Sequence, residues 1–398
     1  MVAIRTRTRF GSSAAGGDIV IPIAAPLLAD EEADAARAVV LSGWVSQGPQ
    51  VAAFEDEFAA LVGAPHACAV ANCTTALQLA LAALDIGRGD EVITVSHSFI
   101  ATANVIRQQG ATPVFVDIEP ETYNLDCAGL EEAITERTRA IIAVHQMGMP
   151  CDMAALMAIA RRHGVAVIED AACAVGSQIR MNGEWTPIGA PYGDIACFSF
   201  HPRKVITTGE GGMLTTANAE LDRKFRLLRQ HGMSVPDTVR HNSSSVIFEE
   251  YVVLGYNCRM TDMQAAIGRR QLERLPELVG RRRTVAAKYA ELLRNLEGLR
   301  LPTEPAWARS NWQSYCVRLP DRFNQRIVMQ NLLDKGIATR RGVMCSHREL
   351  PYAKVAQRHD LRQSELAQDR SILLPIYAQL TEEDLELVAS AVQAEFNK

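Results

Sequence analysis

The first half of the chain alternates short apolar runs with longer stretches in which apolar residues recur at helical spacing. The short runs predict buried strands over 67–70, 90–95, 113–116, 140–144 and 165–168. The stretches between them predict helices over 49–61, 76–84, 101–109, 129–134 and 153–163. Strands that alternate with helices through short loops are typical of a mostly parallel sheet with helices on both faces. Ligands bind to such sheets at the carboxyl ends of the strands.

The segments outside this alternation predict the rest of the fold. An extended entry over 20–28 leads to a helix over 30–41, with Asp30 as its N-cap. Asn182 and Gly183 predict the turn of a hairpin between 178–181 and 184–186. The C-terminal half predicts helices over 219–230, 262–296, 324–335 and 381–396, an exposed loop over 231–250 and a strand over 314–319. Pro276 lies inside the longest of these helices and is expected to break it.

Composition and charge narrow the classes of protein to consider. The chain has 398 residues, 48% of them hydrophobic, which is enough for two domains with a large shared core. We expect a flexible leader over 1–18, a large domain over 19–270 and a small domain over 271–398. A net charge of −5 argues against a nucleic-acid partner, and no apolar run is long enough to span a bilayer. Nine cysteines without close pairs indicate reduced thiols in a cytoplasmic protein and argue against a metal site.

One stretch carries the most distinctive chemistry. Lys204 ends the run Ser-Phe-His-Pro-Arg-Lys, between an apolar strand and a glycine-rich turn over 209–212. Burial at the edge of a core should lower the pKa of the Lys204 ammonium and free its amine to form a Schiff base with a carbonyl such as pyridoxal phosphate (PLP). A surface lysine that closes a turn fits the same residues. Neither a dinucleotide-binding glycine motif nor a phosphate-binding P-loop occurs in the chain.

Other residues match the further needs of a PLP site. Asp170 closes a buried strand and is the best acid for the pyridine nitrogen, while Glu169 on the opposite face is expected to be solvated or salt-bridged. The amides of Cys73 and Thr74 at a helix start would bind a phosphate, although a plain helix cap fits equally. Phe99 is either a plate for the cofactor ring or a core residue.

The order of these motifs resembles one known family. Ser-x-His-x-x-Lys followed by Thr-Thr-Gly-Glu-Gly-Gly is similar to the DegT/DnrJ/EryC1/StrS family of PLP-dependent sugar aminotransferases. Further similar motifs run in order from about residue 20 to the C-terminus, which makes the resemblance specific. It implies an α/β PLP fold type I, like aspartate aminotransferase. In that fold a large domain with a mostly parallel mixed sheet is joined to a small α+β C-terminal domain.

The resemblance also implies roles for individual residues. Lys204 would bind PLP and act as catalytic base and acid, with Asp170 at the ring nitrogen. The remaining cofactor contacts would be Cys73, Thr74, Phe99, Cys173, Ser199 and, reaching the other subunit of a dimer, Asn257. Cys173 stands where the family often has His or Gln near the ring hydroxyl. The substrate contacts would be Trp44, His201 and Arg259, and His201 is also a catalytic candidate. From the residues alone, Trp44 and Asn257 are also ordinary turn residues.

The resemblance implies that the protein transfers an amino group from L-glutamate to the keto group of a nucleotide-linked deoxysugar. L-Glutamate becomes 2-oxoglutarate in this reaction. The resemblance implies a cytoplasmic homodimer with its active site at the subunit interface. A cyclitol or another antibiotic-precursor ketone is an alternative acceptor. A non-catalytic PLP-binding regulator is a further alternative, although no basic DNA-binding domain is appended. The family's dehydratases replace the lysine by histidine, so Lys204 disfavours that activity.

Overall fold

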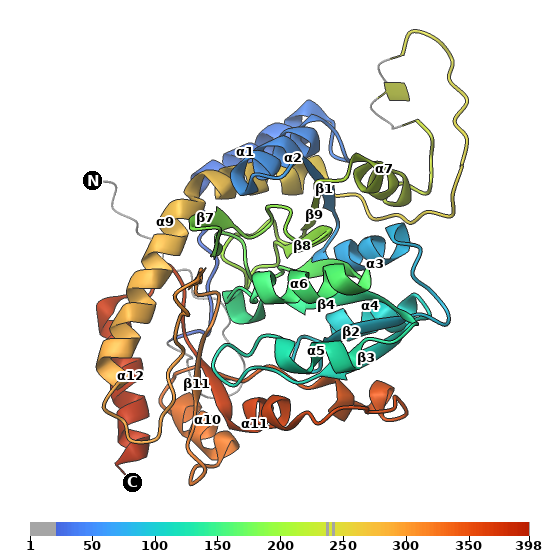
Figure 1. The fold of residues 1–398 in the computed structure, drawn as a ribbon. Coiled ribbons are helices and arrows are strands. Elements are labelled where there is room, and N and C mark those ends of the chain that lie inside the picture. The colour runs from blue at the N-terminus through green and yellow to red at the C-terminus, as the bar shows by residue number, and fades with distance from the viewer. Residues whose placement is uncertain (1–20, 236–238, 241–242, 398) are drawn as a thin grey trace.

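A mixed seven-stranded sheet forms the centre of the large part of the molecule (Figure 1). The computed structural model describes residues 21–235, 239–240 and 243–397, so the leader expected over 1–18 lies outside the described residues. The strand order is β1-β9-β8-β5-β4-β2-β3. The strands are β1 (His66–Val70), β2 (Glu91–Val95), β3 (Thr112–Val116), β4 (Thr138–Val144), β5 (Ala166–Asp170), β8 (Ile195–Ser199) and β9 (Gly212–Thr216). All neighbours pair in parallel except β9, which is antiparallel to β1 and β8, so the predicted mostly parallel mixed sheet is confirmed.

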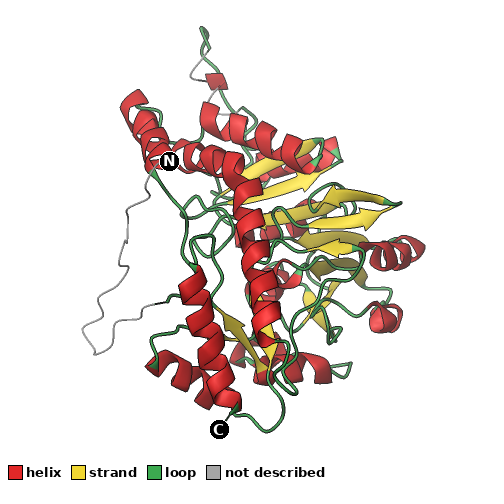
Figure 2. Ribbon diagram, turned by 90° about the vertical axis from the view of Figure 1, so that its left-hand side faces the viewer, coloured by secondary structure: helices red, strands yellow, loops and turns green. Residues whose placement is uncertain are grey.

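Helices cover both faces of this sheet (Figure 2). The core on one face includes side chains of α3 (Cys73–Ala83), α4 (Ala101–Gln108) and α7 (Ala219–Leu228). The core on the other face includes side chains of α2 (Pro49–Val62), α5 (Leu130–Ala133), α6 (Met153–His163) and the first part of α9 (Asp262–Leu293). Successive residues of β1 alternate between the two cores, as the pleat of a strand requires.

The C-terminal part has its own small sheet and its own core. The sheet has the order β11-β13-β12, formed by β11 (Tyr315–Arg318), β12 (Arg340–Arg341) and β13 (Ser371–Leu374). Its helices are α10 (Gln325–Asp334), α11 (Arg362–Arg370) and α12 (Glu382–Phe396). The core around this sheet also takes Ile21 from the entry segment and the last part of α9. These observations support the predicted small α+β domain, whose boundary at residue 270 stays a prediction.

Shorter elements complete the described chain. A third sheet has the order β10-β6-β7, with β6 (Gln178–Met181), β7 (Glu184–Pro187) and β10 (Ala308–Arg309), and its β6–β7 hairpin turns at Asn182 and Gly183 as predicted. Four 3-10 turns lie at Cys127–Gly129, Gln146–Gly148, Ser346–Arg348 and Leu350–Tyr352. No helix among the described residues is both long and apolar enough to cross a membrane.

Two predictions of helix boundaries were wrong. Asp30 does not cap α1 (Asp30–Ser42) but is its first residue, after Ala29 at the N-cap. The Ala29 N–H is bound by Glu32, whose carboxylate also accepts a hydrogen bond of 2.6 Å from Gln271 of α9. Pro276 does not break α9, which continues for 32 residues and curves along the molecule (Figure 1). Buried side chains on both sides of Pro276 hold the helix against two cores, so the loss of one backbone bond is tolerated.

Candidate active site

The carboxyl ends of β5 and β8 bring the predicted cofactor residues together. Asp170 ends β5 and pairs with Cys197 of β8, two residues before Ser199. Ser199 pairs with Gly212 of β9, which in turn pairs with Val70 at the end of β1. The sheet thus places the strand-end acid, the hydroxyl and the turn before α3 along one edge, as parallel β topology predicts.

Asp170 is held by two donors from outside β5. Its Oδ2 accepts a hydrogen bond of 2.7 Å from Thr102 Oγ1, and its Oδ1 accepts one of 3.2 Å from the Ala172 N–H. The Thr102 hydroxyl is in turn 3.0 Å from the Ser98 hydroxyl. The carboxylate is therefore oriented at the strand end, where Asp170 is only 6% exposed.

The turn before α3 has the form of an anion site. Asn72 caps the helix, and its side chain accepts bonds from the N–H and the hydroxyl of Thr75. Because Thr75 is engaged in this way, the Thr74 hydroxyl is the remaining candidate for a phosphate. Within the described residues no acceptor takes the N–H of Cys73 or Thr74, so the donors at the positive end of the helix dipole stay available.

Gly212 lets β9 lie directly against this turn. A Cβ atom at Gly212 would come within 2.5 Å of the Asn72 carbonyl carbon and 2.7 Å of the Cys73 nitrogen. A side chain at this position would therefore push the turn away from the Ser199 strand. Gly212 of the glycine-rich turn therefore allows a close approach to the backbone of the anion turn.

Lys204 lies close to Asp170 but is not the low-pKa amine that the sequence predicted. Its Nζ donates a hydrogen bond of 3.1 Å to the Sγ of Cys173. Burial by itself would lower the pKa of the Lys204 ammonium, but the interactions with Cys173, Cys73 and Asp170 outweigh it and raise the pKa above its ordinary value. The prediction was wrong because it considered desolvation alone and not the groups that surround the amine.

Cys73 lies near Lys204 and Asp170. Burial, followed by the nearby Asp170 carboxylate, raises the pKa of the Cys73 thiol well above its ordinary value. The thiol therefore stays protonated, and the contribution of Cys73 to an anion site is its backbone N–H.

His201 lies on the turn that carries the lysine. Its Nδ1 accepts a hydrogen bond of 3.2 Å from the Arg203 N–H, and its own N–H points to the Ser199 hydroxyl at 3.5 Å. Desolvation first, and then the charges of Lys204 and Arg203, lower the pKa of His201. The imidazole is therefore neutral near pH 7, which suits a proton acceptor.

Phe99 is not a core residue. Its side chain is 69% exposed, and it lies shortly after the end of β2. Its carbonyl accepts the N–H of Thr102, the residue that binds Asp170. This position next to the acid is compatible with a ring plate, and the core alternative is excluded.

The structure places the other predicted residues around the cluster. Arg259 forms a bridge with Val70, the last residue of β1, beside the anion turn. Asn257 is exposed and bridges Gln230 at the start of the long loop. Neither has a described contact with Lys204, and their roles stay predictions.

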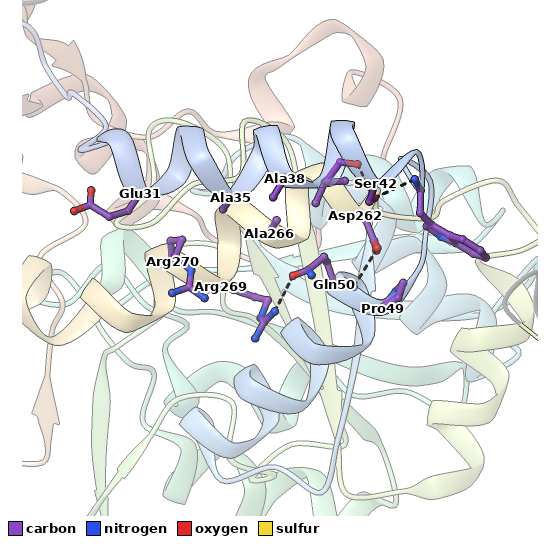
Figure 3. Close-up of a pocket in the computed structure, with 12 residues that line it drawn as sticks. Glu31, Ala35, Ala38, Ser42, Pro49, Gln50, Asp262, Ala266, Arg269 and Arg270 are labelled. Carbon is purple, nitrogen blue, oxygen red and sulfur yellow. Dashed lines mark hydrogen bonds between the residues drawn. The ribbon is translucent and has the colours of Figure 1, made fainter.

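Trp44 lines a separate cavity of about 640 Å³. Figure 3 shows this cavity between α1 and α9, with Ala35 of α1 and Ala266 of α9 among the residues that line it. Its indole N–H donates to the Gln47 carbonyl at 3.0 Å. Asp262 fixes the loop that carries it, because the carboxylate accepts the N–H groups of Gly48, Gln50 and Val51. Neither Lys204 nor Asp170 lines this cavity, so within the described chain Trp44 is not part of the lysine cluster.

Several residues of the site were missed by sequence reasoning. Thr102 had a usable signal, since it lies in the first turn of a helix that follows a strand end. Asn311 and Gln313 had none, because they reach the site from the segment before β11, far along the chain.

Glu169, expected to be solvated or salt-bridged, is 1% exposed and binds His145 Nε2 at 2.9 Å.

Comparison with known proteins places this geometry among aminotransferases. The model of the DegT/DnrJ/EryC1/StrS aminotransferase family matches residues 26–393. The spore coat polysaccharide biosynthesis protein SpsC of Bacillus subtilis is 39% identical over 379 residues, which cover 94% of this chain and 96% of SpsC.

Solved structures of aminotransferases share the fold. The aminotransferase TlmJ of Streptoalloteichus hindustanus superposes with a TM-score of 0.87 at 34% identity, covering 95% of this chain and 99% of TlmJ. The PLP form of Spr1654 from Streptococcus pneumoniae has a TM-score of 0.87 at 26% identity, covering 95% of this chain and 98% of Spr1654. A PMP form of the same protein has a TM-score of 0.88.

Proposed function

Because the chain belongs to the DegT/DnrJ/EryC1/StrS aminotransferase family and is a transaminase, we propose that it moves an amino group from L-glutamate to the keto group of a nucleotide-linked deoxysugar. The proposed cofactor is PLP, bound through Lys204. The observation that carries the proposal is the position of the Lys204 amine, which lies at the sheet edge beside Asp170 and the anion turn.

The donor set of the site fits PLP. Asp170 is an oriented carboxylate for the ring nitrogen, and the free N–H groups of Cys73 and Thr74 are donors for the phosphate. Ser199 adds a hydroxyl at the same edge, and Phe99 adds an exposed ring. PLP, when bound, supplies an electron sink that stabilises negative charge on the donor's α-carbon.

The chain's own residues would then handle protons and orientation. The Nζ of Lys204 would take the proton from the donor's α-carbon and deliver it to the C4′ atom of the cofactor. Asp170 would bind the ring nitrogen, and the hydrogen bond from Thr102 orients the Asp170 carboxylate. The neutral His201 imidazole stands on the lysine turn as a second proton acceptor near the substrate.

The sugar acceptor rests on the family resemblance and on the relatives. SpsC bears the name of a polysaccharide biosynthesis protein, which favours a sugar substrate. The proposed substrate contacts are His201 and Arg259. Trp44 lies at a separate cavity, so its proposed contact with the substrate rests on the resemblance alone. The glutamate donor and the nucleotide link rest on the resemblance alone.

We also propose a homodimer whose active sites lie between subunits. Asn257 is exposed and follows a loop with large exposed apolar side chains, among them Val246, Phe248 and Leu254 at 84%, 90% and 93% exposure. Such side chains are costly in water and are typical of a surface that another chain covers.

Replacing Lys204 by alanine tests the central assignment. The purified wild-type protein should bind PLP with a yellow colour and convert L-glutamate to 2-oxoglutarate in a half-reaction, whereas Lys204→Ala should do neither. Lys354→Ala, which removes an exposed lysine, is the control and should behave as the wild type. Turnover retained by Lys204→Ala would defeat the assignment. A panel of nucleotide-linked ketosugars and cyclitol ketones, read by mass spectrometry, then identifies the acceptor.

A further inference from the structure

The Lys204 amine has a partner that the family resemblance does not provide. At the position of Cys173 the family often has histidine or glutamine near the ring hydroxyl of the cofactor. In this chain the Sγ of Cys173 instead accepts a hydrogen bond of 3.1 Å from the Nζ of Lys204. The sulfur of Cys173 is therefore a direct hydrogen-bond partner of the Lys204 amine.

One segment holds both sides of this contact. The Asn311 side chain, which is fully buried, donates 2.8 Å hydrogen bonds to the carbonyls of Cys173 and Val175. Two residues later, Gln313 donates a hydrogen bond of 2.5 Å to the carbonyl of Arg203, the residue before the lysine. The backbones that carry the thiol and the amine are thus tied to the same short stretch of chain.

Gly148 shows how closely the Asn311 side chain is packed against the backbone of Cys173. A Cβ atom at Gly148 would come within 2.0 Å of the Asn311 side-chain oxygen and 3.1 Å of the Cys173 carbonyl oxygen. The backbone of Asn311 is also held in place, because its N–H donates a 3.0 Å hydrogen bond to the Ser177 hydroxyl. A contact whose supports are packed in this way is a defined feature of the site rather than a chance approach of two flexible side chains.

Cys173 also differs from the other thiols of the chain. All nine cysteines are free, and only Cys127 and Cys173 are not buried. Cys127 lies on a 3-10 turn near Asp126 and Asp152, away from the lysine. Cys173 is therefore the accessible thiol that faces the site, and Cys127 is a matched control.

We propose that Cys173 is a positioning residue, because its sulfur holds the Lys204 amine in place for covalent capture of the cofactor aldehyde. The inference rests on the proposed function of Lys204. In the capture step the ammonium first releases a proton to solvent. The nitrogen lone pair then attacks the aldehyde carbon, a C=N bond replaces the C=O bond, and the oxygen leaves as water with the two remaining nitrogen protons.

The direction of the effect follows from the hydrogen bond. A partner that binds the charged form favours it, and the interaction with Cys173 is the leading cause that raises the pKa of Lys204 against burial. Without the sulfur the amine should lose its proton at lower pH. It should also be less well placed once it is neutral.

The test is the pH profile of cofactor capture by the cofactor-free, full-length protein. Capture is followed by absorbance and, after borohydride reduction, by mass spectrometry of the peptide that carries Lys204. In Cys173→Ala the profile should move to lower pH. At a pH below both midpoints, capture should be up to about tenfold faster than in the wild type if the midpoint falls by one pH unit. At high pH it should reach a lower plateau than the wild type, because the amine is no longer held.

Four variants separate the possible outcomes. Cys173→Ser keeps a hydrogen-bonding side chain and should restore part of the wild-type profile, whereas Cys127→Ala should match the wild type throughout. A Cys173→Ala profile that superimposes on that of the wild type would overturn the inference and leave the proposed function intact. Failure of the wild-type protein to capture PLP at Lys204 would instead refute the proposed function itself, with Lys204→Ala as the blank.

Discussion

Replacing Thr102 by valine tests how far Asp170 depends on a donor outside its own strand. The Thr102 hydroxyl and the Asp170 carboxylate are 2.7 Å apart, and the two residues are only 1% and 6% exposed. A buried hydrogen bond to a charged group contributes about 1.5–3 kcal/mol. Valine keeps the shape of threonine but removes the donor, so the loss falls on Asp170, which retains only the Ala172 N–H among its described donors.

This loss predicts a large kinetic effect. Because about 1.4 kcal/mol corresponds to a tenfold change in rate, Thr102→Val should lower kcat/KM about 10- to 100-fold if the whole contribution is made in the transition state. The assay is the half-reaction with L-glutamate, together with the thermal unfolding midpoint of the same samples. Thr102→Ser keeps the hydroxyl and should stay near the wild-type rate. A folded Thr102→Val enzyme with undiminished kcat/KM, or a Thr102→Ser enzyme that is equally impaired, would refute the role given to this hydrogen bond.

Three further predictions follow from other contacts. Glu55→Gln should destabilise the fold by about 3–5 kcal/mol, because it leaves two arginine partners without a buried carboxylate. Burial alone would raise the pKa of Glu55, but the two arginines outweigh it and lower the pKa. The wild type should therefore lose this stability as the pH falls through the lowered pKa, whereas the variant should not. Urea unfolding of both proteins across pH measures the difference. Gly212→Ala should weaken PLP binding in a fluorescence titration by displacing the anion turn, whereas Gly129→Ala, where a Cβ meets open space, should bind normally. Mixing inactive Lys204→Ala and Asn257→Ala subunits should restore part of the activity if sites are shared between subunits, and no recovery after subunit exchange would contradict the shared site.

The sequence was sufficient for the architecture, and it also singled out Asp170 and Lys204, whose roles stay proposals. Apolar runs of strand length, separated by helical stretches, predict the sheet because each strand must bury both faces between helices. Asp170 was proposed as a site residue because an acid that closes a buried strand is costly unless it has a specific partner. Lys204 was proposed from its motif between two apolar strands, although a surface lysine fitted the same residues. The order of the motifs indicated the family that the comparison confirmed.

The tertiary structure decided how the site residues act on one another. Pro276 looked like a break, but packing on two cores outweighs the loss of one backbone hydrogen bond. The direction of the Lys204 pKa shift was predicted wrongly because burial is visible in a local pattern, whereas Cys173 and Asp170 come from another strand end. Asn311 reaches the site from more than a hundred residues away in the chain. Local sequence specifies strands, helices and caps through short-range energetics, whereas charges and hydrogen bonds across the site depend on distances that exist only after the chain has folded.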